Sequence, residues 1–98
     1  MKVSVQSVNF NIDVDLIKYI EKRVNNLEKF HDNIIGAEVF LKVQKSSEKE
    51  NKISELKINL PGNDIIVKKH SKSFEEAVSL SVDAVKRQLL KRKEKLRA

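Results

Sequence analysis

Residues 73–97, SFEEAVSLSVDAVKRQLLKRKEKLR, form the stretch that decides the fold. Neither glycine nor proline interrupts it, and Ser73 with Glu76 matches a capping box, in which the two side chains satisfy each other's backbone donors. Apolar side chains recur at a spacing of three or four residues, as they do on one face of a helix. We therefore predict a long amphipathic helix that buries one face against another layer. The residues of that face are Phe74, Val78, Val82, Val85, Leu89 and Leu96, with Ala77 and Ser81 at its edge.

A second amphipathic helix is predicted over residues 14–30. Asp13 is placed to cap its first turn, and Asp15 suits the positive end of the helix dipole. One side of this helix carries Leu16, Ile17, Ile20, Val24 and Leu27, and the opposite side carries Lys18, Lys22 and Lys29.

Alternation of apolar and polar residues predicts four strands. In the first strand the alternation changes phase near Gln6 and Ser7, which suggests a bulge. Pro61-Gly62-Asn63 is a turn signal between the third and fourth strands, since these residue types fit turn backbones. The strands are expected within residues 2–10, 34–45, 52–60 and 65–69, with a charged loop at 46–51.

The predicted elements follow the order β-α-β-β-β-α, which indicates an α+β fold. Two helices with one apolar stripe each can cover one face of a four-stranded sheet, so we expect a two-layer sandwich around one core. Three consecutive strands with short links should form a meander. With 98 residues the chain has room for a single domain, spanning residues 1–98.

The positive charge of the chain is concentrated in residues 86–98. This segment holds seven basic residues against Glu94 alone, which accounts for the whole net charge of +6. Concentrated positive charge indicates a polyanionic partner, either nucleic acid or a membrane surface. Cations near the end of a helix also complement its dipole, but seven are more than the dipole needs. The charge pattern therefore favours nucleic acid over a merely solvated helix end.

Catalysis has little support in the sequence. There is no Gly-rich phosphate loop and no nucleophile elbow, and His31 and His70 lack the spacing of a metal pair. The chain has no cysteine, which excludes disulfides and thiolate metal sites. No apolar run approaches the ~18 residues of a membrane helix, and the N-terminus lacks the apolar block of a signal peptide. We expect a cytoplasmic protein that is no enzyme, needs no cofactor or metal, and has neither a membrane partner nor a small-molecule substrate.

The polar faces of the two helices are expected to share one surface if the helices pack side by side. Such a surface could track phosphates by charge. Aromatic residues are scarce, with one Tyr and four Phe, which argues against recognition by base stacking. The patch would consist of Lys18, Lys22 and Lys29 beside Lys86, Arg87 and Lys91.

Two stretches resemble the ribosome hibernation factors, a family of ribosome-associated translation inhibitors. Residues 19–30, YIEKRVNNLEKF, are similar to the family's first helix, which reads as an aromatic, v-e-x-K and L-x-K. The second helix of the family reads as an aromatic, a-A-I, an Asp and Q-L-x-K-x-K. Its counterparts are Phe74-Glu75-Glu76-Ala77-Val78, Asp83, Gln88-Leu89, Lys91 and Lys93. The resemblance covers nearly the whole chain and departs from the family at Val8, often Gly, and Val67, often Ala.

The resemblance implies a fold similar to double-stranded RNA-binding domains with an added first strand. It implies binding to the small ribosomal subunit and its ribosomal RNA, in the decoding channel, where messenger and transfer RNA are then sterically excluded. It also implies a short form, without the further C-terminal domain by which long forms pair ribosomes. By position, the RNA contacts are Arg23, Lys86, Lys91 and Lys93, then Lys22, Arg87 and Arg92, with Lys18 added from the charge pattern.

Two other functions remain open at this point. The chain could be a general double-stranded RNA- or DNA-binding module, or a protein-interaction domain that its basic end keeps in solution. A general binder should be titrated away by bulk duplex RNA, a ribosome-specific factor should not, and an interaction domain should bind neither.

Overall fold

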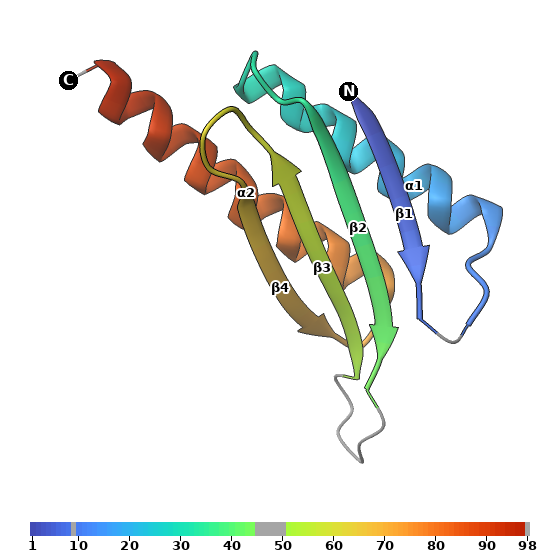
Figure 1. Ribbon diagram of the computed structural model, residues 1–98. Helices are drawn as coiled ribbons and strands as arrows, with labels where there is room; N and C mark the ends of the chain where they lie inside the picture. Colours follow the sequence, from blue (N-terminus) through green and yellow to red (C-terminus); the bar gives the residue numbers. More distant parts are fainter. Residues whose placement is uncertain (9, 45–50, 98) are drawn as a thin grey trace.

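A computed structural model of the protein describes residues 1–8, 10–44 and 51–97, with the side chains of residues 93–97 outside the described part. Its elements follow the predicted order, with two helices on one face of a four-stranded sheet (Figure 1). The α+β two-layer architecture is therefore confirmed. Most of the predicted loop at 46–51 lies outside the described residues.

The sheet has the strand order β1-β2-β3-β4. Strands β2, β3 and β4 pair antiparallel as the predicted meander, whereas β1 pairs parallel to β2 at the edge. A parallel neighbour needs a crossover connection, which helix α1, Val14–Asn25, supplies between β1 and β2. The strands are β1 Lys2–Ser7, β2 Gly36–Val43, β3 Lys52–Asn59 and β4 Ile65–Ser71.

The first strand is shorter than the alternation predicted. It ends at Ser7 rather than residue 10, and its register with β2 is continuous, so the phase change marks the strand's end and not a bulge. The Ser7 hydroxyl donates to the Phe10 carbonyl just after the end of the strand. Phe10 lies beyond the end of the strand, and its ring stacks on that of Phe74 with 4.9 Å between ring centroids. At the other edge, β4 runs two residues beyond the predicted end and stops at Ser71.

The helices begin where their capping residues predicted. Helix α1, Val14–Asn25, opens with the Asp13 carboxylate accepting from the Leu16 backbone N–H at 2.8 Å. Helix α2, Phe74–Arg97, opens with the Ser73 hydroxyl accepting from the Glu76 N–H at 3.2 Å. The α-helix predicted through residue 30 stops at Asn25, and the chain continues as the 3₁₀ segment η1, Asn26–Phe30. A tightened last turn of this kind is common at helix ends.

The core lies between the helix layer and the sheet. Seven residues of the two predicted stripes are at most 5% exposed: Ile20, Val24, Leu27, Val78, Val82, Val85 and Leu89. Leu16, Ile17 and Phe74 are only partly buried, and the side chain of Leu96 lies outside the described residues. Ser81 is also fully buried, but its hydroxyl donates to the Ala77 carbonyl at 2.9 Å, so its polar atom has a partner. The apolar stripes read from the sequence thus hold both helices on the sheet, with their other sides turned to solvent.

Candidate nucleic-acid interface

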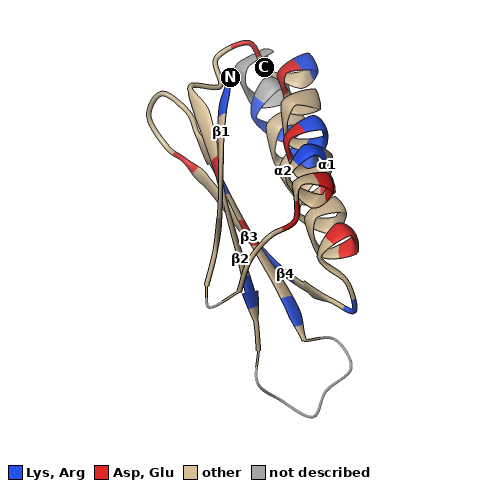
Figure 2. Ribbon diagram, turned by 90° about the vertical axis from the view of Figure 1, so that its right-hand side faces the viewer, with Lys and Arg blue, Asp and Glu red and all other residues tan. Residues whose placement is uncertain are grey.

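The two helices run parallel, so their like ends lie together. Tyr19 donates to the Glu75 carbonyl at 3.5 Å near their starts, and Lys86 of α2 lies over Phe30 of η1 further along. Acidic residues stand in the first turns of both helices (Asp15, Glu75 and Glu76), and basic residues gather toward the opposite end (Figure 2). The helix surface is therefore graded in charge, and the predicted continuous positive surface is confined to its C-terminal part.

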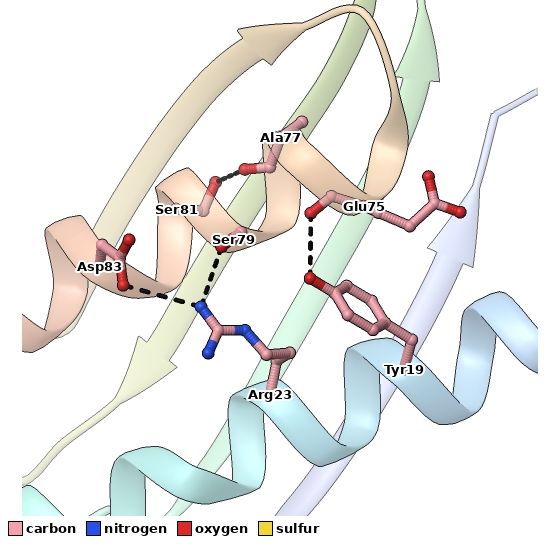
Figure 3. Close-up of polar contacts among 7 residues, drawn as sticks. All are labelled: Tyr19, Arg23, Glu75, Ala77, Ser79, Ser81 and Asp83. Carbon is pink, nitrogen blue, oxygen red and sulfur yellow. Dashed lines mark hydrogen bonds and ion pairs between the residues drawn. The ribbon is translucent and has the colours of Figure 1, made fainter.

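Arg23 lies in the seam between the helices rather than on the open surface. Its Nη2 donates to the Ser79 hydroxyl at 2.9 Å and lies 3.7 Å from the Asp83 carboxylate (Figure 3). One third of the Arg23 side chain is exposed, and its Nε is buried without a described partner. The structure thus places this predicted RNA contact where it also links α1 to α2.

Lys86 occupies the next turn of the same seam. Its ammonium lies 4.6 Å from the centre of the Phe30 ring, a cation–π geometry that limits where the side chain can point. Around it is a groove of about 200 Å³ between α1, η1 and α2. The polar residues lining this groove are Arg23, Asn26, Lys29, Asp83 and Lys86. Three cations and one carboxylate give it a net positive charge, suited to an anion such as a phosphate.

Three further predicted contacts lie on the same two helices, outside the lining of the groove. Lys22 on α1 and Arg87 and Lys91 on α2 are exposed. Within the residues whose side chains are described, none of these three forms an ion pair, and neither do Lys29 and Lys86. Their charges are therefore available to an external anion. We refer to Lys22, Lys29, Lys86, Arg87 and Lys91 as the basic end of the helix layer.

Three predicted contacts lie apart from the basic end. Lys18 is exposed but stands one turn from Asp15, in the part of α1 where the charge is mixed. Arg92 turns away from the seam, because its Nη1 donates to the Asn63 carbonyl at 2.7 Å, in the turn between β3 and β4. The side chain of Lys93 lies outside the described residues.

The outer face of the sheet is mixed in charge. Lys57 is 3.8 Å from the carboxylates of both Glu38 and Asp64, so one cation there is shared between two acids. In the strand register Glu55 stands opposite Lys68. Acidic and basic side chains are therefore interspersed on the described part of this face.

Sequence reasoning missed part of the groove. Phe30 had no assigned role, although its place immediately after Lys29 in the family-like stretch was a signal for it. Asp83 was recognised as a family position but not as the partner of Arg23. Both assignments depend on the lateral contact of two helices that are 56 residues apart at the Arg23–Ser79 bond, a contact that no local pattern specifies.

The described residues show neither a metal centre nor a membrane span. Among them no group of three or more His, Cys, Asp or Glu side chains could hold a metal ion. No helix in the described part of the chain is both long and apolar enough to cross a membrane.

Comparison with solved structures supports the fold. A ribosomal subunit interface protein from Coxiella burnetii matches 96% of this chain with a TM-score of 0.84 and 22% identity, and 99% of its own chain is covered. The Protein Y N-terminal domain from Thermus thermophilus matches 93% of this chain with a TM-score of 0.78 and 23% identity, and 98% of its chain is covered. At these identities the likeness establishes the arrangement of helices and strands.

Comparison with sequences establishes the family. The ribosome hibernation promoting factor of Azotobacter vinelandii is 26% identical over 95 residues, covering 97% of this chain and 85% of that relative. The ribosome hibernation promotion factor of Bacillus subtilis is 22% identical over 98 residues, and there this chain spans half of the relative's length. The family model described as Sigma 54 modulation protein / S30EA ribosomal protein matches residues 3–97. The chain therefore belongs to this family, that of the ribosome hibernation promoting factors.

Proposed function

We propose that this protein binds the small ribosomal subunit through ribosomal RNA and occupies its decoding channel. The observation that carries the proposal is the basic end of the helix layer, where five cations have no described ion-pair partner. Family membership supplies the ribosome as the target. Such a factor acts in the cytoplasm, where ribosomes are found.

Phosphate recognition by charge accounts for the composition of the basic end. Lysine and arginine neutralise phosphates and release condensed counterions, a contribution that is independent of sequence. The groove beside Lys86 adds shape to this charge, because a phosphate seated there meets Lys29, Lys86 and the edge of Arg23 together. A rigid two-helix layer can therefore fit folded RNA whose phosphates have a matching spacing.

Inhibition follows from occupancy and requires no chemical step. A domain with principal extents of 46 × 25 × 19 Å would fill space that messenger and transfer RNA need in the channel. We therefore propose a steric, non-enzymatic translation inhibitor. On this mechanism the loss of binding and the loss of inhibition must run in parallel.

The test compares two triple variants with equal loss of charge. Lys86→Gln, Arg87→Gln and Lys91→Gln together remove three charges from the basic end, and Lys2→Gln, Lys42→Gln and Lys68→Gln remove three from the outer face of the sheet. Binding to small subunits is measured against salt, together with inhibition of translation in vitro. The basic-end variant should flatten the log–log salt slope by about two to three units if each side chain meets one phosphate.

The control variant should keep the wild-type slope and inhibition. Messenger and transfer RNA already bound in the channel should compete with the wild-type protein, whereas bulk duplex RNA should not. If the two triple variants behave alike, the basic end is only a solvated surface. If bulk duplex RNA competes as strongly as the subunit binds, the protein is instead a general duplex binder.

A further inference from the structure

A second recess lies beside the basic end, outside the seam. It has a volume of about 410 Å³ and is lined by His31 and Asn33, by the turn at Leu60–Asn63, and by Arg92 of α2. The segment before β2 and the turn between β3 and β4 meet at one end of the sheet, next to the second half of α2 (Figure 1). The volume lies within the range of small-ligand pockets, about 300–1,000 Å³.

Two side chains of this recess, Arg92 and His31, present hydrogen-bond donors. The Arg92 guanidinium is held by one bond, from Nη1 to the Asn63 carbonyl at 2.7 Å. A guanidinium carries five N–H groups, so most of its donors remain for a ligand among the described contacts. The His31 Nδ1 accepts from the Asn33 backbone N–H at 3.1 Å, which places the proton of the neutral ring on Nε2 as a further donor.

The recess also has flat and apolar surface. Pro61 is exposed at the turn, and the side chains of His31 and Arg92 are partly buried against the recess. The imidazole ring of His31 is a flat group of the kind on which RNA bases stack. A recess with a planar lining and fixed donors therefore fits a base better than it fits a compact, strongly hydrated anion.

The donors select among the bases. Guanine presents two neighbouring acceptors, O6 and N7, to which an arginine can donate two parallel bonds. Adenine presents N7 beside the N6 amino group, which is a donor and would face the arginine donors. Because Arg92 is already oriented by Asn63, little rotamer freedom remains to be lost when a guanine binds.

We propose that this recess binds one unpaired guanine nucleotide of the RNA partner, with Arg92 reading the base and the neighbouring basic end holding the phosphates. The inference rests on the proposed function for its RNA source, but the recess itself can be tested with a mononucleotide. It assigns Arg92 a different task from Lys91, the residue next to it, which is exposed and would contact phosphate alone.

The test measures the binding of guanosine monophosphate to the full-length protein. Amide chemical shifts and calorimetry at fixed salt are the readouts. Adenosine monophosphate and inorganic phosphate are the comparison ligands. Guanosine monophosphate should bind about tenfold more tightly than adenosine monophosphate and shift the amides of Asn33, Gly62 and Asn63. Arg92→Gln should abolish this preference. Arg92→Lys should also abolish it, since lysine keeps the charge but lacks the two-pronged geometry.

Lys91→Gln is the matched control and should leave guanine preference unchanged while weakening RNA binding with the loss of one charge. Equal binding of both mononucleotides, equal shifts with inorganic phosphate, or a guanine preference that survives Arg92→Gln would overturn the proposal. None of these results would contradict the proposal that the protein binds the small subunit. Conversely, if the protein prefers guanine but does not bind ribosomes, the guanine site stands and the proposed function is wrong.

Discussion

Arg23 and Lys86 line the same groove, yet the protein uses them differently. Arg23 bonds Ser79 across the seam and lies near the Asp83 carboxylate, so part of its charge is balanced within the molecule. Lys86 rests over the Phe30 ring and has no described carboxylate partner. The groove thus contains Arg23, which joins the two helices, and Lys86, whose charge is available to a ligand. A basic residue at a helix seam can have a packing role and a binding role at once, and the two must be measured separately.

Arg23 and Lys86 keep these different roles only while both helices stay packed on the sheet. Removing a core side chain should therefore have the largest effect on both. Ile20→Ala should lower the free energy of unfolding by about 2–5 kcal/mol, because a fully buried side chain is replaced by a cavity. Chemical denaturation followed by circular dichroism measures this loss. Val14→Ala, at a position that is 63% exposed, should change it by less than about 0.5 kcal/mol. Equal unfolding midpoints for the two variants would show that Ile20 is not part of the core.

Replacing Arg23 should separate its packing role from binding. Arg23→Gln should cost about 0.5–1.5 kcal/mol of stability, since glutamine is too short to keep the bond to Ser79. Lys22→Gln, one residue away and exposed, is the control for charge and should leave the unfolding free energy nearly unchanged. If both variants lose the same stability, the Ser79 bond contributes nothing and Arg23 is simply another surface cation.

The contact between Lys86 and Phe30 is expected to be worth about 0.5–1 kcal/mol, the range for a partly exposed cation–π pair. A double-mutant cycle with Phe30→Leu and Lys86→Gln isolates this coupling from the general effect of each change. Leucine keeps an apolar side chain without the ring. A coupling energy of zero would mean that Phe30 does not orient Lys86.

Asp83 should produce a small loss of stability and a gain in binding. Asp83→Asn removes a partner of Arg23 that is 60% exposed, so stability should fall by less than about 1 kcal/mol. The same change raises the net positive charge of the groove and should strengthen RNA binding. Filter binding to small subunits at low and high salt measures the gain, which should shrink as salt rises. Weaker binding by Asp83→Asn would indicate that the carboxylate orients Arg23 for its RNA contact.

The fold could be predicted from the sequence because its determinants are local. The stripes of both helices, the caps at Asp13 and Ser73 and the turn at Gly62, where φ is +92°, are each specified within a few residues. The same local reasoning placed the end of the first strand too late. Valine and phenylalanine at positions 8 and 10 suit a strand, and the bond from Ser7 to the Phe10 carbonyl could not be read from the alternation.

The site was less predictable, because it depends on how the helices face each other. A helical wheel places Arg23 beside the apolar stripe but cannot tell whether its neighbour is solvent or α2. It also places Arg92 at the flank of the α2 stripe, without showing that Arg92 reaches the turn between β3 and β4. Residues that project straight outward, Lys22, Arg87 and Lys91, were located correctly as exposed positions, because no tertiary contact decides where they point.

The parallel arrangement of α1 and α2 has a consequence for the rate of binding. Since acidic first turns lie together and cations lie together at the other end, the molecule has a charge asymmetry along its helices. The electric field of a polyanion exerts a torque on such a charge distribution, which turns the basic end toward the polyanion before contact is made. Productive encounters should therefore be more frequent than for a uniformly charged domain of the same net charge. Added salt should slow association far more than it speeds dissociation, because orientation acts over distances that salt screens.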